Sequence, residues 1–161
     1  MEYITTRSIE DFKVVIDDLR PELGERFPTS IENWCGIGAR PYPLPVWAVY
    51  LARTDSGPTP EPVGICSYYR QTEDPVDRFW LGWIGVRPNF RRQGRASAML
   101  ERVYLELCRR GARKICVYTS NPEAVALYKS FGMSIDGTFS STGLVQAAAT
   151  GDEVLLSMSV I

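Results

Sequence analysis

The chain has no histidine among its 161 residues. This absence excludes nucleophilic catalysis of the Ser-His-Asp or Cys-His kind, and it excludes most zinc sites. The four cysteines form no C-x-x-C pair, which argues against the usual metal and redox motifs. Any chemistry must therefore use tyrosine, serine, cysteine, carboxylates, backbone groups or a bound cofactor, and we expect no metal.

The chain also lacks an excess of charge of either sign and a long apolar run. Eighteen Lys and Arg balance nineteen Asp and Glu, so no global field attracts nucleic acid and any anion site must be local. No run of about eighteen apolar residues, which would indicate a membrane span, is present. The start, MEYITTRSIEDF, does not have the layout of a signal peptide. We therefore expect a cytoplasmic protein with no nucleic-acid or membrane partner.

The composition, 45% hydrophobic and 23% charged, is that of a folded domain, and the length suits one domain over residues 1–161. Hydrophobic periodicity predicts strands at 2–8, 46–53, 63–70, 78–86, 112–120, 133–141 and 153–161. The order of elements is β-α-α-β-β-β-α-β-α-β-β. Hairpins at both ends of this order exclude a uniformly doubly wound sheet and predict an α+β fold with a mixed, mostly antiparallel sheet flanked by helices.

Four helices are expected between these strands. The first runs from Ile9 to Leu19 and ends at Pro21 and Gly24; the second runs over 30–39, with Ser30 as its cap and with Trp34 and Ile37 facing inward. The third helix is long, and one of its faces has an apolar stripe formed by Ala96, Met99, Leu100, Val103 and Leu107. Glu106 and Arg110 can pair at i,i+4, and Gly111 ends the helix. The fourth begins at Asn121 and ends at Gly132.

The junction between strand 78–86 and the third helix reads VRPNFRRQGRA. The first N–H groups of a helix have no intrahelical partner and carry partial positive charge, and a glycine there lets a ligand approach the backbone. Arginines around such a glycine are typical of a pyrophosphate site, although a solvent-exposed basic turn explains them too. A nucleotide-binding domain stays a third hypothesis, but the P-loop and G-x-G-x-x-G motifs are missing.

Two further segments bear on the same site. Gly82 and Gly85 interrupt the bulky strand WLGWIGV, which predicts either a bulge that frees backbone groups for a ligand or close packing against Trp80 or Trp83. In NPEAVALYKSFG, Asn121 caps a helix that begins with Pro122, and Tyr128 follows two turns later. Tyr128 either faces the same cleft as Asn121 or belongs to the core.

Together these segments resemble the GNAT superfamily of N-acetyltransferases. The family signature [QR]-x-x-G-x-[GA] falls on Arg91, Gly94 and Ala96. The second motif, N-x-x-A-x-x-L-Y-x-x-x-G-[FM], matches at Asn121, Ala124, Leu127, Tyr128, Gly132 and Met133. The resemblance covers residues 60–161 well, whereas residues 1–60 match only in the order of elements. It implies a GNAT-like fold, whose central sheet is splayed.

The resemblance also implies acetyl-CoA as the acyl donor. The backbone of Ile84, Gly85 and Val86 would bind the pantetheine arm of the cofactor. Asn121 would contact the pantetheine side of the cofactor, and Tyr128 would act as general acid beside the thioester sulfur. The pyrophosphate would be wrapped by the main-chain amides of Arg92, Gln93, Gly94, Arg95, Ala96 and Ser97, and Arg91 would also serve the negatively charged cofactor. The implied function is transfer of acetyl from acetyl-CoA to a primary amine by direct attack. A non-catalytic acyl-CoA-binding sensor or interaction module of the same fold is the alternative.

The general base and the acceptor are not determined by the sequence. Trp80 and Cys116 stand where family members often carry a glutamate. Deprotonation would therefore use a water chain to a remote carboxylate, the C-terminal carboxylate, or an amine that is already neutral. Asp74, Asp77 and Asp136 are the candidate water-linked carboxylates. The acceptor is a small-molecule or peptide amine. Six aromatic residues either line its pocket or belong to the core: Trp34, Tyr42, Trp47, Tyr69, Trp80 and Trp83. The oligomeric state, a homodimer included, stays open.

Overall fold

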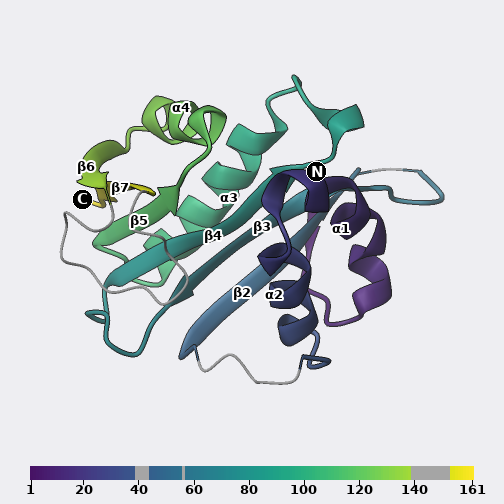
Figure 1. Cartoon of the computed structure of the whole chain (residues 1–161), viewed down its shortest axis with the longest axis horizontal. Helices are drawn as coiled ribbons and strands as arrows, with labels where there is room; N and C mark the ends of the chain where they lie inside the picture. Colours follow the sequence, from purple (N-terminus) through teal and green to yellow (C-terminus); the bar gives the residue numbers. More distant parts are fainter. Residues whose placement is uncertain (39–43, 56, 139–152) are drawn as a thin grey trace.

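Figure 1 shows the computed structural model of the chain, which describes residues 1–38, 44–55, 57–138 and 153–161. The described residues form one seven-stranded sheet in the order β1-β2-β3-β4-β5-β7-β6. Its strands are β1 (Glu2–Ile4), β2 (Val46–Arg53), β3 (Pro62–Arg70), β4 (Arg78–Val86), β5 (Lys114–Thr119), β6 (Ser134–Thr138) and β7 (Val154–Ser159). The helices are α1 (Ile9–Leu23), α2 (Arg26–Trp34), α3 (Arg95–Arg109) and α4 (Pro122–Ser130), with a 3-10 turn over Pro88–Phe90.

The sheet is mixed and mostly antiparallel, which confirms the predicted fold class. Of its neighbouring pairs, only β4 and β5 run parallel. The residues between them include α3, as a parallel connection requires. β4 is the fourth of seven strands, so its apolar character on both faces follows from its central place.

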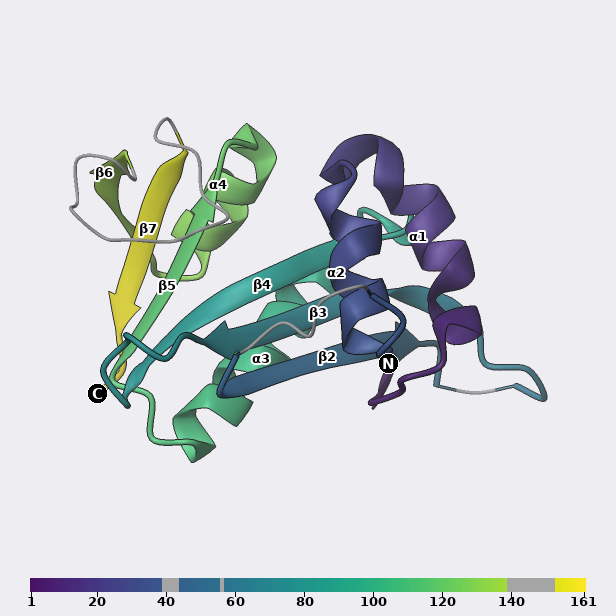
Figure 2. The same cartoon turned by 60° about the horizontal axis from the view of Figure 1, so that its bottom comes forward.

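The helices cover both faces of the sheet. In Figure 2, α1 and α2 lie on one face of β2–β4 and α3 lies on the other. The apolar stripe of α1 packs on the first face through Phe12, Val15 and Leu19, together with residues of α2. The stripe predicted for α3 is buried at Met99, Leu100, Val103 and Leu107, and it joins residues of α4 in the larger core cluster.

The first two helices differ from the prediction at their ends. α1 continues through Pro21 to Leu23, and it ends where Gly24 adopts a φ of 79° and donates its N–H to the carbonyl of Arg20. α2 begins four residues before Ser30, whose hydroxyl donates to the carbonyl of Arg26 inside the helix instead of capping it. Because α2 ends at Trp34, Ile37 lies outside it with 60% of its surface exposed, whereas Trp34 is buried as predicted.

A bulge disturbs the pairing of β3 with β4. Cys66 pairs with Ile84 and Tyr68 with Leu81, so Gly82 and Trp83 together face the single residue Ser67. The buried Ser67 hydroxyl accepts a hydrogen bond from the Trp83 N–H at 2.7 Å, and a Cβ on Gly82 would lie 2.3 Å from this oxygen. The bulge predicted from the two glycines is therefore present, and Gly82 makes room for the serine.

The second glycine of β4 has a different role. A Cβ on Gly85 would approach a methyl group of Leu19 in α1 to 2.7 Å. The sequence prediction considered packing against Trp80 or Trp83, but the neighbour is a leucine of the helix above the strand. Gly85 therefore lets α1 lie close to the sheet.

β4 and β5 separate after Trp80, just before the bulge. Their described register has three pairs, which join Arg78–Trp80 to Lys114–Cys116. After Cys116, β5 continues to pair with β7 but no longer with β4. In Figure 2 the two strands meet at one end and diverge toward the other, which is the splay that the family resemblance implied.

Candidate functional site

A cleft of about 500 Å³ lies where β4 and β5 diverge. Its walls come from the α1–α2 connection, from β2, β3, β4 and β5, and from α4. The bulge residues Gly82 and Trp83 line it together with Ile84, and the opposite wall includes Asn121 and Tyr128. The cleft therefore brings the interrupted strand and the second motif together, as the sequence suggested.

The loop from β4 to α3 has two residues with left-handed backbone. Arg92 has a φ of 62° and Gly94 a φ of 70°, which is uncommon for a residue other than glycine. The first helical hydrogen bond of α3 is donated by Ala98 to the carbonyl of Gly94. The amides of Arg95, Ala96 and Ser97 therefore precede the helical ladder. Nothing lies within 4 Å of the place where a Cβ on Gly94 would be, so the loop is open on this side.

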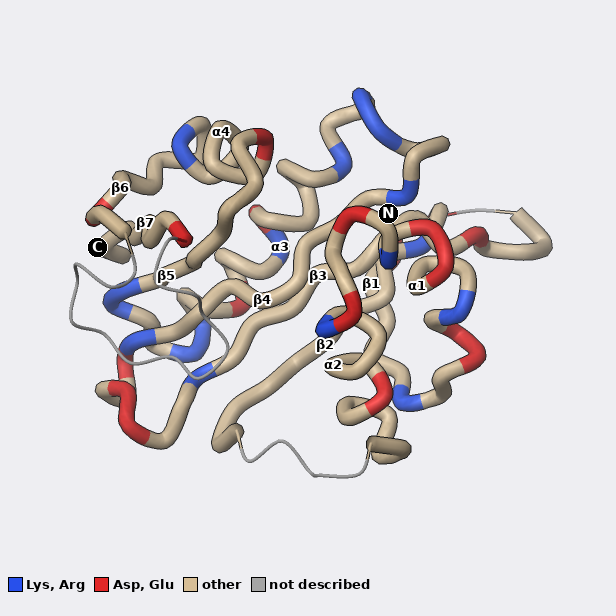
Figure 3. The backbone as a smooth tube through the Cα atoms, viewed as in Figure 1, with Lys and Arg blue, Asp and Glu red and all other residues tan. Residues whose placement is uncertain are grey.

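Positive charge gathers on this loop, as the blue segments between β4 and α3 show in Figure 3. Two of the three predicted arginines have partners within the protein. Arg91 bonds the Glu22 carboxylate of α1 at 2.7 Å and the Val86 carbonyl at 2.8 Å, and Arg95 bonds Gln93 at 3.1 Å. Arg91 thus ties the loop to α1 and to the end of β4.

The second motif begins as predicted and ends in the cleft. The Asn121 side chain accepts a hydrogen bond from the Glu123 N–H at 2.9 Å and so caps α4. Tyr128, two turns later, is 5% exposed but lines the cleft. Burial raises the pKa of Tyr128 to about 12. Its hydroxyl therefore keeps its proton throughout the neutral and mildly alkaline range.

Comparison with known proteins shows the family in which this arrangement occurs. The family model described as Acetyltransferase (GNAT) family matches residues 13–133, well over half of the chain. The chain belongs to the GNAT family of acetyltransferases. A search of curated proteins finds no match. Family membership supports acyl transfer as the general chemistry of the GNAT site described above.

Solved GNAT structures share the fold over most of the chain. A GNAT-family protein from Desulfovibrio desulfuricans is 15% identical with a TM-score of 0.72, each chain being covered to 98%. An aminoglycoside 6'-N-acetyltransferase complexed with coenzyme A is 15% identical with a TM-score of 0.68, covering 100% of this chain and 98% of its own. A GNAT acetyltransferase from Elizabethkingia anophelis with acetyl-CoA bound is 22% identical with a TM-score of 0.54, covering 71% and 76%.

The carboxylates of the GNAT cleft differ from those considered in the sequence. None of Asp74, Asp77 and Asp136 is among the residues that line it. Asp74 accepts the Trp80 indole N–H at 2.8 Å, and Asp136 accepts the Ser157 hydroxyl at 2.7 Å, so both carboxylates hold other side chains. Three glutamates that sequence reasoning missed line the cleft instead: Glu22, Glu25 and Glu153.

The two positions without the expected glutamate are buried. Trp80 and Cys116 pack with Leu155 in a small core cluster, and burial raises the pKa of the Cys116 thiol to about 11. Neither side chain offers a base for an ammonium group.

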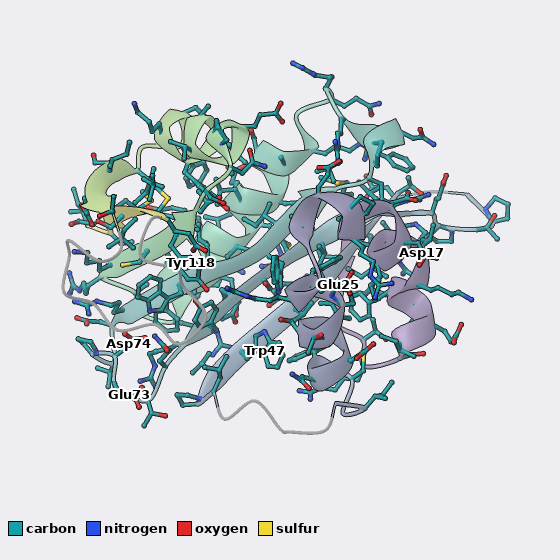
Figure 4. The ribbon with its side chains drawn as sticks, viewed as in Figure 1. Asp17, Glu25, Trp47, Glu73, Asp74 and Tyr118 are labelled. Atoms are coloured by element: carbon teal, nitrogen blue, oxygen red, sulfur yellow. The ribbon has the colours of Figure 1, made fainter. Side chains whose placement is uncertain are left out.

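The aromatic residues named from the sequence divide into two sets. Trp47, Tyr69 and Trp83 are half-buried and line the cleft, whereas Trp34 and Trp80 are buried behind it. Tyr42 lies outside the described residues. The cleft has a further aromatic wall residue, Tyr118, which sequence reasoning missed because its strand position gave no sign of the splay. Figure 4 shows Trp47 and Tyr118 on the side of the sheet that carries α1 and α2.

Two general findings concern metals and membranes. Within the described ranges, no group of three or more His, Cys, Asp and Glu side chains gathers where it could hold a metal ion. Among the helices that the structure describes, none is long and apolar enough to cross a membrane.

Proposed function

We propose that the chain is an acetyl-CoA-dependent N-acetyltransferase that acts on a primary amine by direct attack. The observation that carries this proposal is that Tyr128 and the bulge of β4 line the same cleft. One wall offers backbone groups that β5 does not pair with, and the other offers a buried phenol that keeps its proton.

The residues present fit an acyl-CoA. The edge of β4 from Ile84 to Val86 lies beyond the last β4–β5 pair and runs toward the arginine-rich loop. At that loop, the amides of Arg95, Ala96 and Ser97 stand at the positive end of the α3 dipole, and the missing side chain of Gly94 leaves the approach open. We assign the pantetheine arm to the strand edge and to Asn121, and the pyrophosphate to Arg92–Ser97. Arg91 shapes the loop through Glu22.

The reaction forms a C–N bond and breaks the C–S bond of the thioester. The amine nitrogen attacks the carbonyl carbon, a backbone N–H of Ile84–Val86 polarises the carbonyl oxygen, and the Tyr128 hydroxyl hydrogen-bonds and protonates the departing sulfur. The sequence alone suggested an ordinary tyrosine pKa of about 10. At either value, proton transfer to a free thiolate whose thiol has a pKa of about 8.5 is uphill, so Tyr128 would act chiefly by hydrogen-bonding the departing sulfur. A proton that it gives to the sulfur is returned to its phenolate by the water that takes the amine proton.

The second proton, from the amine, leaves through water. No histidine exists, and the buried Trp80 and Cys116 occupy the positions of the usual glutamate. Holding the amine against the thioester supplies much of the rate, because effective molarities for well-oriented groups reach about 10⁵–10⁸ M.

The lack of histidine, together with Trp80 and Cys116 at the positions of the usual glutamate, also favours a second candidate, a non-catalytic acyl-CoA-binding module. Such a module would bind acetyl-CoA without turning it over, and it would give Tyr128 no chemical role. The discriminating experiment measures thiol release from acetyl-CoA across polyamines, aminoglycosides, amino acids and peptide N-termini. Amine-dependent release supports the enzyme, and binding without any release supports the module.

A further inference from the structure

One wall of the cleft is aromatic. Acetyl transfer to an amine does not by itself require such a wall. In the β2–β3 register Trp47 stands opposite Tyr69, and in the β3–β4 register Tyr69 stands opposite Trp80. Directly opposed residues project from the same face of a sheet. The three rings therefore form a row across three strands, on the face that α1 and α2 share with the cleft.

Two cleft-lining rings are held from behind by Trp80. The Tyr69 ring stacks on Trp80 with centroids 6.3 Å apart and an interplanar angle of 12°, and Tyr118 meets Trp80 edge-on at 6.2 Å. Trp80 is itself buried, and its indole N–H is fixed by the Asp74 carboxylate at 2.8 Å. Tyr69 and Tyr118 are thus presented to the cleft in fixed orientations.

The other two cleft-lining rings are held in the same way. Trp47 contacts Trp34 of α2 edge-on at 5.4 Å, and Trp83 contacts Phe27 of α2 edge-on at 5.4 Å. Both α2 residues are buried. Each of the four half-buried aromatic residues of the cleft therefore rests on a buried ring, so little conformational freedom is lost when a ligand contacts it.

The charged residues of the cleft do not select the acceptor. Three carboxylates and one guanidinium line it, those of Glu22, Glu25, Glu153 and Arg26. Two of these carboxylates are paired with arginines of the protein, Glu22 with Arg91 at 2.7 Å and Glu25 with Arg20 at 3.1 Å, so the aromatic wall carries the argument. The volume of about 500 Å³, which also has to take the acetyl end of the donor, suits a small molecule.

We infer that the acceptor is a small primary amine carried on a flat aromatic body. This inference rests on the proposed function and narrows it. The aromatic body packs against the row of Trp47 and Tyr69 and against Tyr118, and the amine points toward Tyr128. A phenylalanine N-terminus of a peptide offers the same ring on a longer chain, and the test separates it from the small amine.

The test compares kcat/KM for 2-phenylethylamine, ethylamine and a peptide amide that begins with phenylalanine, each corrected for its neutral amine fraction. A single methylene in an apolar pocket already discriminates by about tenfold or more, so we expect 2-phenylethylamine to exceed ethylamine by about a hundredfold. A ratio near one between 2-phenylethylamine and ethylamine overturns the inference, and so does a better rate with the peptide.

Substitution of the aromatic wall should lower the ratio of kcat/KM for 2-phenylethylamine to that for ethylamine. We expect this ratio to fall by about tenfold or more in Trp47→Leu and in Tyr69→Leu, while the KM for acetyl-CoA is unchanged. Tyr50→Leu is the matched control, because Tyr50 lies on β2 but packs in the cluster on the opposite face. An equal loss of preference in Tyr50→Leu contradicts the inference. Turnover of ethylamine without preference leaves the proposed function standing, whereas no turnover of any amine overturns the proposed function instead.

Discussion

The Ser67 hydroxyl lies 2.7 Å from the backbone nitrogen of Trp83 and accepts its hydrogen bond. Through this contact a buried side chain of β3 fixes the extra residue of β4, and β4 leaves β5 at this level of the sheet. The serine hydroxyl therefore holds the bulge next to the opening that we assign to the donor.

Ser67→Ala should weaken both the fold and donor binding. The Trp83 N–H loses its buried partner, which costs about 1–3 kcal/mol in the free energy of unfolding. Because the bulge sets the strand edge, we expect Kd for acetyl-CoA to rise by about tenfold, equivalent to about 1.4 kcal/mol. Denaturant unfolding and calorimetry measure the two effects. Ser157→Ala, which removes a buried hydroxyl bonded to Asp136 at 2.7 Å, should lower stability alone. Unchanged affinity in Ser67→Ala at lowered stability would remove the bulge from the donor site.

Gly94→Glu should abolish or strongly weaken acetyl-CoA binding, since a side chain and a negative charge would occupy the open side of the loop. We expect Kd to rise by at least about tenfold. Gly111→Glu is the control, because Gly111 also has a left-handed backbone, with a φ of 81°, and open space around it, but it follows the other end of α3. Both variants carry the same steric strain. Equal affinities for the two would refute the pyrophosphate site.

Tyr128→Phe should act on the chemical step and leave the fold intact. The change keeps the buried ring and removes only the hydroxyl, so the melting temperature should barely move. General acid catalysis by one group is worth about 10²–10⁴ in rate, and we expect kcat to fall by this factor. Tyr68→Phe provides the comparison, because Tyr68 is fully buried, has a pKa raised to about 12 as well, and does not line the cleft. If both variants keep the wild-type rate, Tyr128 belongs to the core alone.

The pH dependence should report the amine and no dedicated base. An alkylamine with a pKa of about 10.4 is neutral in about one molecule in 2,500 at pH 7, so activity should rise with pH toward the amine pKa. Burial raises the Tyr128 pKa to about 12; its protonated form therefore persists below that value, and no descending limb due to Tyr128 should appear before the amine is neutral. A pH–rate profile with the best amine measures this.

The same profile is needed for amide variants of six carboxylates. Three are the positions suggested by the sequence, Asp74, Asp77 and Asp136, and three are the cleft glutamates, Glu22, Glu25 and Glu153. We expect none of the six to be indispensable for deprotonation. A plateau near pH 6–7 that one substitution abolishes would identify a dedicated base and would show this prediction to be wrong.

Local patterns allowed much of the fold to be predicted. The stripe of α3, the Asn121 cap and the glycines of β4 are properties of short segments, and all three are present. The ends of α1 and α2 were missed because tertiary packing overrides local signals: α1 tolerates Pro21 within its last turn, and Ser30 bonds backward inside α2.

Less of the candidate site could be predicted from the sequence. The partners that define it are distant in the chain: Ser67 beside Trp83, Glu22 beside Arg91, and Tyr118 beside Trp80. No spacing rule connects them, because strand register and the splay of β4 from β5 bring them together. The same holds for Asp74, whose carboxylate serves Trp80.

The central claim is that the chain transfers acetyl from acetyl-CoA to an amine, and product analysis tests it most directly. The purified protein is incubated with acetyl-CoA and 2-phenylethylamine or the wider amine panel, and thiol release and the mass of the amine product are followed together. The account predicts thiol release that depends on both protein and amine, a product heavier by one acetyl group, and loss of both signals in Tyr128→Phe. Tight binding of acetyl-CoA with no acetylated product from any amine would contradict it and would identify the chain as a binding module.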